Sequence, residues 1–197
     1  NSYNIDVDRI FDFVTSKTKV VTPVSYAGNP VYLQKIYDKL HEKGIVVIHD
    51  AAHALGAKRN GYGIVDFCDM AMVSFHPVKH ITTGEGGVIL TNNEEFYKKL
   101  NLFRSHGITK NPDELIYDNE PWYYEMQDLG FNYRITDFQC ALGRSQLKKA
   151  DKFIKRRNEI ADIYYNQLKG YEKFKLFKNY DDEKTVHAFH LYPVLLS

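Results

Sequence analysis

One lysine lies where its side-chain amine could do chemistry. Lys79 ends the run Ser74-Phe-His-Pro-Val-Lys79, and Gly84-Glu-Gly-Gly87 follows, so the loop can hold the lysine against the preceding strand. Partial burial and nearby cations help a lysine lose its proton and become nucleophilic, and His76 and His80 flank this one. Ser74 could present its hydroxyl to a phosphate oxygen. For a lone lysine a surface position is the commoner interpretation, and a hairpin turn explains the glycines equally well.

A carboxylate follows an aliphatic run earlier in the chain. Ile45–Ile48 is predicted to be a strand buried on both faces of a sheet, and His49-Asp50-Ala-Ala-His53 follows at its carboxyl end. Open α/β sheets bind ligands at this end of their strands. A buried carboxylate needs a cationic partner, for which a protonated pyridine nitrogen is suitable. Considered alone, Asp50 is better explained as the N-cap of a helix.

The elements that would position these residues alternate between strand and helix. Strands are predicted at 19–24, 45–48, 70–75 and 87–91, and apolar residues at helical spacing predict a helix over 31–43 that Gly44 ends. A strand, helix and strand in this order form a βαβ unit, so a parallel sheet in an α/β fold is expected.

The second half of the chain is predicted to be mainly helical or irregular. A helix is predicted over 94–105, irregular chain over 107–128, and one or two long helices over 137–170. A terminal strand over 188–196 then suggests a second, smaller α+β domain. Near the start, 8–16 also looks helical.

Four blocks, in this order and spacing, resemble one family. They are Asp50-Ala-Ala-His53, Ser74–Lys79, Thr82-Thr-Gly-Glu-Gly-Gly87 and Gly130-Phe-Asn-Tyr-Arg-Ile-Thr-Asp-Phe-Gln-Cys-Ala-Leu-Gly143. Together they are similar to the DegT/DnrJ/EryC1/StrS sugar aminotransferases, which have fold type I and use pyridoxal 5'-phosphate. Three further blocks agree with the branch of that family on the route to pseudaminic acid: Arg104–Gly107, Gln146–Asp151 and His190–Pro193.

The resemblance implies a role for five residues. Lys79 would hold the cofactor as a Schiff base, and Asp50 would face the pyridine nitrogen and keep the ring an electron sink. His53 would lie beside the ring, and Ser74 would contact the phosphate. Asn132 would reach the phosphate bound by a neighbouring subunit, which implies a homodimer with shared active sites.

Four other polar residues near these blocks are expected to be structural. Arg134 would form an ion pair, and Tyr133, His187 and His190 would pack against the site without acting in it.

The implied reaction is transamination of a nucleotide-linked 4-keto-6-deoxy sugar, with glutamate as amino donor. The expected acceptor is UDP-4-keto-6-deoxy-N-acetyl-L-altrosamine. Lys79 would move the proton between the donor's α-carbon and the cofactor. A related branch dehydrates sugars and has His at this position. Because this chain has Lys79 there, the resemblance favours transamination. Alternatives are amination of another nucleotide keto sugar, or a regulatory or binding protein with a degenerate fold.

The resemblance also divides the chain and suggests that it is a fragment. Residues 1–135 would be the C-terminal portion of the cofactor-binding large domain, a three-layer α/β fold, and 136–197 the start of the small domain. The family's Gly-Thr phosphate segment and ring-stacking aromatic residue are not found here.

Composition excludes some classes of partner. Lys and Arg number 26 and Asp and Glu 25, so no net field favours nucleic acid. No apolar run would span a membrane, and no zinc-like spacing or Walker-type loop occurs. Cys68 and Cys140 are expected to be buried free thiols, so we predict a cytoplasmic protein.

Overall fold

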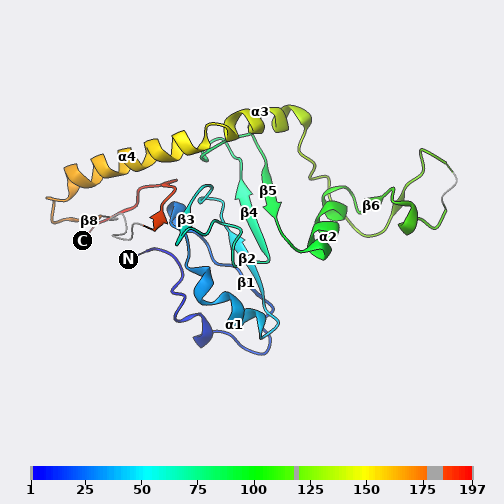
Figure 1. Ribbon diagram of the computed structural model, residues 1–197, viewed down its shortest axis with the longest axis horizontal. Coiled ribbons are helices and arrows are strands. Elements are labelled where there is room, and N and C mark those ends of the chain that lie inside the picture. The colour runs from blue at the N-terminus through cyan, green and yellow to red at the C-terminus, as the bar shows by residue number, and fades with distance from the viewer. Residues whose placement is uncertain (1, 118–119, 177–183, 197) are drawn as a thin grey trace. The chain divides into compact units, whose positions relative to one another are not determined.

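The computed structural model describes residues 2–117, 120–176 and 184–196. The chain forms two compact units. One contains residues 1–90 and 138–197, and the other contains residues 91–137 (Figure 1). The expected division at 135/136 stays a prediction.

A four-stranded sheet is the centre of the first unit. Its strands are β1 (Val20–Val21), β2 (Val46–Asp50), β4 (Met70–Ser74) and β5 (Gly87–Leu90), in the order β1-β2-β4-β5. The first three are parallel, which confirms the parallel sheet expected from the sequence. β5 pairs antiparallel with β4.

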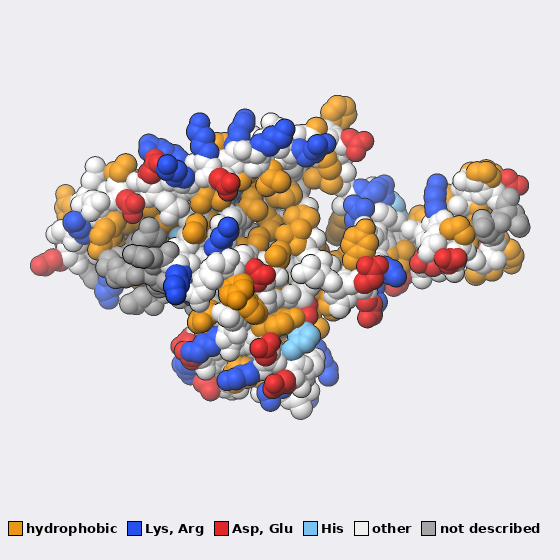
Figure 2. Space-filling model, viewed as in Figure 1, with side chains coloured by type: hydrophobic (Ala, Val, Ile, Leu, Met, Phe, Trp, Pro, Cys, Tyr) orange, Lys and Arg blue, Asp and Glu red, His pale blue; other side chains and the backbone are white. Residues whose placement is uncertain are grey.

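The two faces of this sheet differ in burial. Side chains alternate along β2 and β4, so Val47 and Val73 are buried whereas Met72 is 37% exposed. Exposed hydrophobic side chains reach the surface in the region of β4 and β5 (Figure 2). The prediction that residues 45–48 are buried on both faces is therefore wrong for the described part of the chain, where one face is open.

Helical structure covers the buried face less completely than expected. Residues 31–43 form the 3-10 turn η3 (Leu33–Lys35) and the short helix α1 (Tyr37–His41), and not one continuous helix. Gly44 follows with φ +67°, which favours glycine and ends the helix. The stretch 8–16 contains only the 3-10 helix η1 (Ile10–Asp12).

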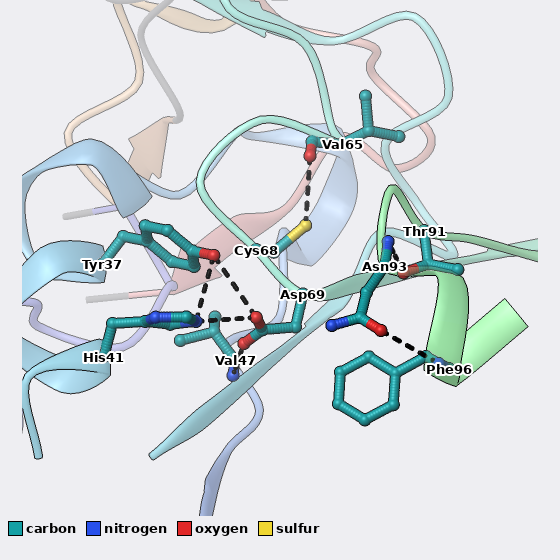
Figure 3. Close-up of polar contacts among 9 residues, drawn as sticks. All are labelled: Tyr37, His41, Val47, Val65, Cys68, Asp69, Thr91, Asn93 and Phe96. Carbon is teal, nitrogen blue, oxygen red and sulfur yellow. Dashed lines mark hydrogen bonds and ion pairs between the residues drawn. The ribbon is translucent and has the colours of Figure 1, made fainter. Parts of the chain in front are cut away.

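A polar cluster ties α1 to the sheet (Figure 3). The Asp69 carboxylate accepts hydrogen bonds from His41 Nε2 at 2.8 Å, Tyr37 Oη at 3.3 Å and the backbone N–H of Val47 at 2.7 Å. Burial, and then the Asp69 charge, raises the pKa of Tyr37, so its hydroxyl stays a donor. One carboxylate thus ties α1 to β2, because its two oxygens accept from both helix and strand.

The C-terminal part of the first unit is mainly helical. It contains α3 (Asp137–Leu147) and α4 (Ala150–Leu168), which confirm the long helices. Two antiparallel pairs accompany them: β8 (Phe174–Leu176) with β10 (Val194–Leu196), and β3 (Lys58–Arg59) with β9 (Thr185–Val186). The terminal strand is shorter than the predicted 188–196.

The second unit is built around α2 (Glu94–Arg104). The side chain of Asn93 accepts from the backbone N–H of Phe96 at 3.1 Å and caps the helix (Figure 3). The irregular segment contains only the pair β6 (Ile108–Thr109) and β7 (Glu125–Met126) and the 3-10 turn η4 (Pro112–Glu114) in its described residues.

Both cysteines are free thiols, as expected. Burial raises the pKa of Cys68 to about 12, so it stays protonated. Cys140 is exposed, so the prediction that it is buried was wrong. None of the helices in the described ranges has the length and hydrophobicity needed to cross a membrane.

Candidate active site

The parallel strands β2 and β4 bring two polar side chains to one edge and one face of the sheet. Asp50 ends β2 and Ser74 ends β4. In the register Asp50 lies beside Met72, and Ser74 is two residues further along the same strand. Asp50, Met72 and Ser74 therefore project from the same face, which is the open one.

The loop after β4 carries Lys79 and is closed by backbone hydrogen bonds. Phe75 N–H donates to the carbonyl of Gly86 at 2.9 Å, and Thr83 N–H donates to the carbonyl of Phe75 at 3.1 Å. A Cβ on Gly87 would lie 2.9 Å from the carbonyl oxygen of Val73, so this approach requires glycine. The loop therefore holds the half-buried Lys79 at the carboxyl edge of the sheet.

Lys79, Asp50 and His53 share one electrostatic environment. Burial lowers the pKa of Lys79, and the negative charge of Asp50 partly opposes that change. Burial also lowers the pKa of His53, helped by the charge of Lys79 and opposed by that of Asp50. The structure therefore brings these three residues together, with an amine that releases its proton more easily than an exposed lysine.

Asp50 is not a helix cap. Its Oδ1 accepts from the backbone N–H of Ala52 at 3.1 Å, and residues 51–57 form turns without a helix. The N-cap interpretation is wrong because the chain turns back here, which leaves the carboxylate at the strand end next to Lys79.

His53 is held by the turn η2 (Tyr26–Gly28). Its Nδ1 accepts the backbone N–H of Ala27 at 3.3 Å, so in the neutral ring the proton is on Nε2. Its ring contacts Tyr26 at a centroid distance of 5.9 Å and His190 at 4.3 Å.

The histidines beside Lys79 differ from the sequence expectation. His76 is exposed, with Nε2 3.8 Å from Glu85 Oε1. His80 is buried and donates from Nε2 to the carbonyl of Ala188 at 3.0 Å. Burial, and then the charge of Arg157, lowers the pKa of His80 to about 4, so it is neutral at pH 7. The expectation of a cation at His80 was therefore wrong.

Ser74 and Asn132, the two residues expected to contact a phosphate, lie in different units of the chain. Ser74 Oγ accepts from the backbone N–H of His76 at 3.3 Å, which leaves its hydroxyl hydrogen available for a phosphate oxygen. Asn132 belongs to the unit of residues 91–137, where it is exposed and bridges Ser105 through its backbone. Its role towards a neighbouring subunit stays a prediction. In the same unit, Tyr133 stacks on Phe131 at 4.9 Å.

The residues at this edge fit pyridoxal phosphate. A carboxylate for the pyridine nitrogen, an amine of lowered pKa for the aldehyde carbon and a free hydroxyl hydrogen for the phosphate come from adjacent strand ends. His, Cys, Asp and Glu form no metal-binding group in the described ranges.

His190 lies beside the site, as expected from the sequence, but its partners there were not predicted. Its ring contacts both His53 and His80, and its electrostatic neighbours include Lys79 and Arg157. The only sequence signal was its place in the His190–Pro193 block, which carried no distance information.

The fold is that of the pyridoxal-phosphate aminotransferases of fold type I, present in part. The chain belongs to the DegT/DnrJ/EryC1/StrS aminotransferase family, which it matches over residues 1–197.

The chain is also similar to individual members of this family and to their solved structures. The chain is 38% identical to the UDP-4-amino-4,6-dideoxy-N-acetyl-beta-L-altrosamine transaminase of Campylobacter jejuni, over 100% of this chain and 50% of that protein. The solved structure of Helicobacter pylori PseC, an aminotransferase of pseudaminic acid biosynthesis, is similar with a TM-score of 0.88, 32% identity, and 98% and 50% coverage. The PLP form of the putative sugar aminotransferase Spr1654 from Streptococcus pneumoniae has a TM-score of 0.84, 26% identity, and 100% and 52% coverage. The chain thus spans about half the length of these relatives.

Proposed function

We propose that the protein transfers an amino group to a nucleotide-linked 4-keto-6-deoxy sugar, with glutamate as the donor. The finer proposal is that the acceptor is UDP-4-keto-6-deoxy-N-acetyl-L-altrosamine, on the route to pseudaminic acid. The names of the Campylobacter and Helicobacter relatives support this choice, since both concern that kind of sugar.

The single observation that carries the proposal is that Lys79, in the loop after β4, lies at the same edge of the sheet as the carboxylate of Asp50, which ends β2. Burial lowers the pKa of Lys79, and the charge of Asp50 partly opposes that change. Pyridoxal phosphate, when bound, supplies an electron sink and a carbon that accepts an amine. Lys79 Nζ would hold the cofactor and, once released by the donor amine, would take up and return the proton of the donor's α-carbon. An amine does this best when its pKa lies near the working pH, and partial burial moves the pKa of Lys79 in that direction.

The remaining residues orient the cofactor. Asp50 would keep the pyridine nitrogen protonated, His53 would lie beside the ring, and Ser74 would donate to the phosphate. Asn132 would contact the phosphate of a second subunit, so we propose a homodimer. We also propose that the protein is cytoplasmic, because its two cysteines are free thiols, as in a reducing compartment.

The first experiment tests the anchor. The complete protein is mixed with pyridoxal phosphate, reduced with borohydride and digested, and the peptides are weighed by mass spectrometry. We expect the cofactor mass on the peptide containing Lys79, and none in Lys79→Arg, which keeps the charge but has too high a pKa to react. Lys58→Arg, a change at an exposed lysine of β3, is the matched control and should label normally.

The second experiment separates an enzyme from a binding protein. Glutamate is added to the loaded protein without sugar, and 2-oxoglutarate is measured. One equivalent per site supports the transaminase, whereas labelling of Lys79 without 2-oxoglutarate supports a degenerate binding protein. A panel of UDP- and GDP-linked 4-keto sugars then tests the acceptor. Transfer of the amino group from glutamate to a sugar other than UDP-4-keto-6-deoxy-N-acetyl-L-altrosamine would overturn the finer proposal.

A further inference from the structure

The C-terminal segment Ala188–Leu191 is docked on the turn that holds His53. Ala188 N–H donates to the carbonyl of Gly28 at 2.9 Å, and His190 N–H donates to the carbonyl of Ala27 at 2.8 Å. A Cβ on Gly28 would lie 2.8 Å from the nitrogen of Phe189 and 2.9 Å from the carbonyl oxygen of His53. The segment and the turn therefore meet at backbone contact distance.

Helix α4 holds the same segment from another side. Arg157 Nη1 donates to the carbonyls of Phe189 at 2.9 Å and His190 at 3.3 Å. Asn158 Nδ2 donates to the carbonyl of His187 at 2.9 Å. Phe189 has φ +42°, a left-handed conformation that persists only where neighbours fix it. The backbone of His190 is therefore fixed by the turn and by the helix together.

The ring of His190 completes a cluster of three imidazoles beside Lys79. Its centroid lies 4.3 Å from that of His53 and 5.5 Å from that of His80. The charged groups that face this cluster are Lys79 in the loop after β4, Asp50 at the end of β2 and Arg157 on α4. Burial, and then His53 and Lys79, lowers the pKa of His190 to about 3, so the ring is neutral at pH 7.

We propose that His190 is a positioning residue of the Lys79 site, whose uncharged ring holds the His53 ring in place and keeps water away from the Lys79 amine. This inference rests on the proposed function, since it assigns His190 to the site where Lys79 and His53 act. The face of the His190 ring makes the contact with His53 that the proposal depends on. His190 Nδ1 is buried and has no hydrogen-bond partner among the described residues, so packing and not a hydrogen bond of that nitrogen links it to His53.

The test measures how much of the Lys79 amine is unprotonated at a given pH, in the complete protein without cofactor. The amine is labelled with trace acetic anhydride across a pH series, and the Lys79 peptide is quantified by mass spectrometry. The readout is the ratio of the labelling rate at about pH 8 to that at about pH 11, because access of the reagent affects both rates equally. A lower ratio means that a smaller fraction of the amine is unprotonated at the lower pH.

Four variants separate positioning from general stability. His190→Ala admits water and should lower the ratio about threefold, whereas His190→Phe keeps a planar uncharged ring and should leave it unchanged. Arg157→Lys, which loses the paired donation to two carbonyls, should lower it less. His187→Ala is the matched control, because His187 is buried in the same segment and stacks on Phe189, not on His53. It should lower the melting temperature and not the ratio.

Three results would overturn the proposal: an unchanged ratio in His190→Ala, an equal fall in His190→Phe, or an equal fall in His187→Ala. If His190→Ala does not fold, an unchanged ratio in Arg157→Lys overturns it instead. Because the labelling needs no cofactor, a failure of Lys79 to take pyridoxal phosphate would refute the proposed function and leave this readout intact.

Discussion

Mild acid should destabilise the fold, because buried histidines, among them His80 and His187, are held in the neutral form. His80 is 4% exposed and His187 is 1% exposed. Burial lowers the pKa of His80 from 6.5 to about 4, helped by the charge of Arg157. Burial lowers the pKa of His187 from 6.5 to about 3, helped by His80.

The sign follows from which state binds protons. Below pH 6.5 the unfolded histidines take up protons, whereas the folded ones do so only near pH 4 and pH 3. The stability from the neutral rings is therefore fully present above the unfolded pKa and is lost progressively as the pH falls towards the folded values.

The magnitude follows from the same linkage. Between about pH 7.5 and about pH 5.5, protonation of one unfolded histidine lowers the free energy of unfolding by about 1.4 kcal/mol. For His80 and His187 together the loss is about 3 kcal/mol. Carboxylates titrate mainly below this window and add little to the change.

Urea unfolding at the two pH values measures this loss. His80→Gln can keep the donation to the Ala188 carbonyl without titrating, so it should reduce the pH-dependent loss by about 1.4 kcal/mol. His76→Gln changes an exposed histidine and should leave the loss as it is. Equal stability of the parent protein at both pH values would refute the buried neutral histidines.

Three further changes test the packing around the site and the helices, each by urea unfolding. Gly28→Ala should lower the free energy of unfolding by about 3 kcal/mol, from a left-handed alanine and from overpacking. Its control is Gly44→Ala, which has nothing near its added Cβ and should lower that free energy by about 1 kcal/mol. Equal losses would contradict the close approach at Gly28. Asp69→Ala should cost about 1–3 kcal/mol, because the buried N–H of Val47 loses its acceptor, and a change below the error of the measurement would contradict this (Figure 3). Asn93→Ala should cost about 1 kcal/mol through the lost cap of α2, with a matching decrease in helical circular dichroism.

Local pattern predicted the parts of the site that lie close to their own strands. Asp50 and Lys79 follow aliphatic runs that are strands β2 and β4, and strand ends are set by the residues beside them. The blocks around these residues also identified the family, which the match over residues 1–197 confirms. The helices over 94–105 and 137–170 followed from periodicity, and α2, α3 and α4 confirm them.

Other features depended on which surfaces meet in the folded chain. Asp50 looked like a helix cap, because its neighbours favour a helix, but the chain turns there. His80 looked like a cation beside Lys79, but its ring is buried against Ala188 and is neutral.

The sequence by itself determined the strands, the loop that presents Lys79 and the family, because these follow from residues near one another in the chain. Only the tertiary structure decided that His80 meets Ala188, 108 residues away, and that His190 packs on His53. Burial and charge at such contacts set the pKa values around Lys79, and neither can be read from the order of residues until the fold brings them together.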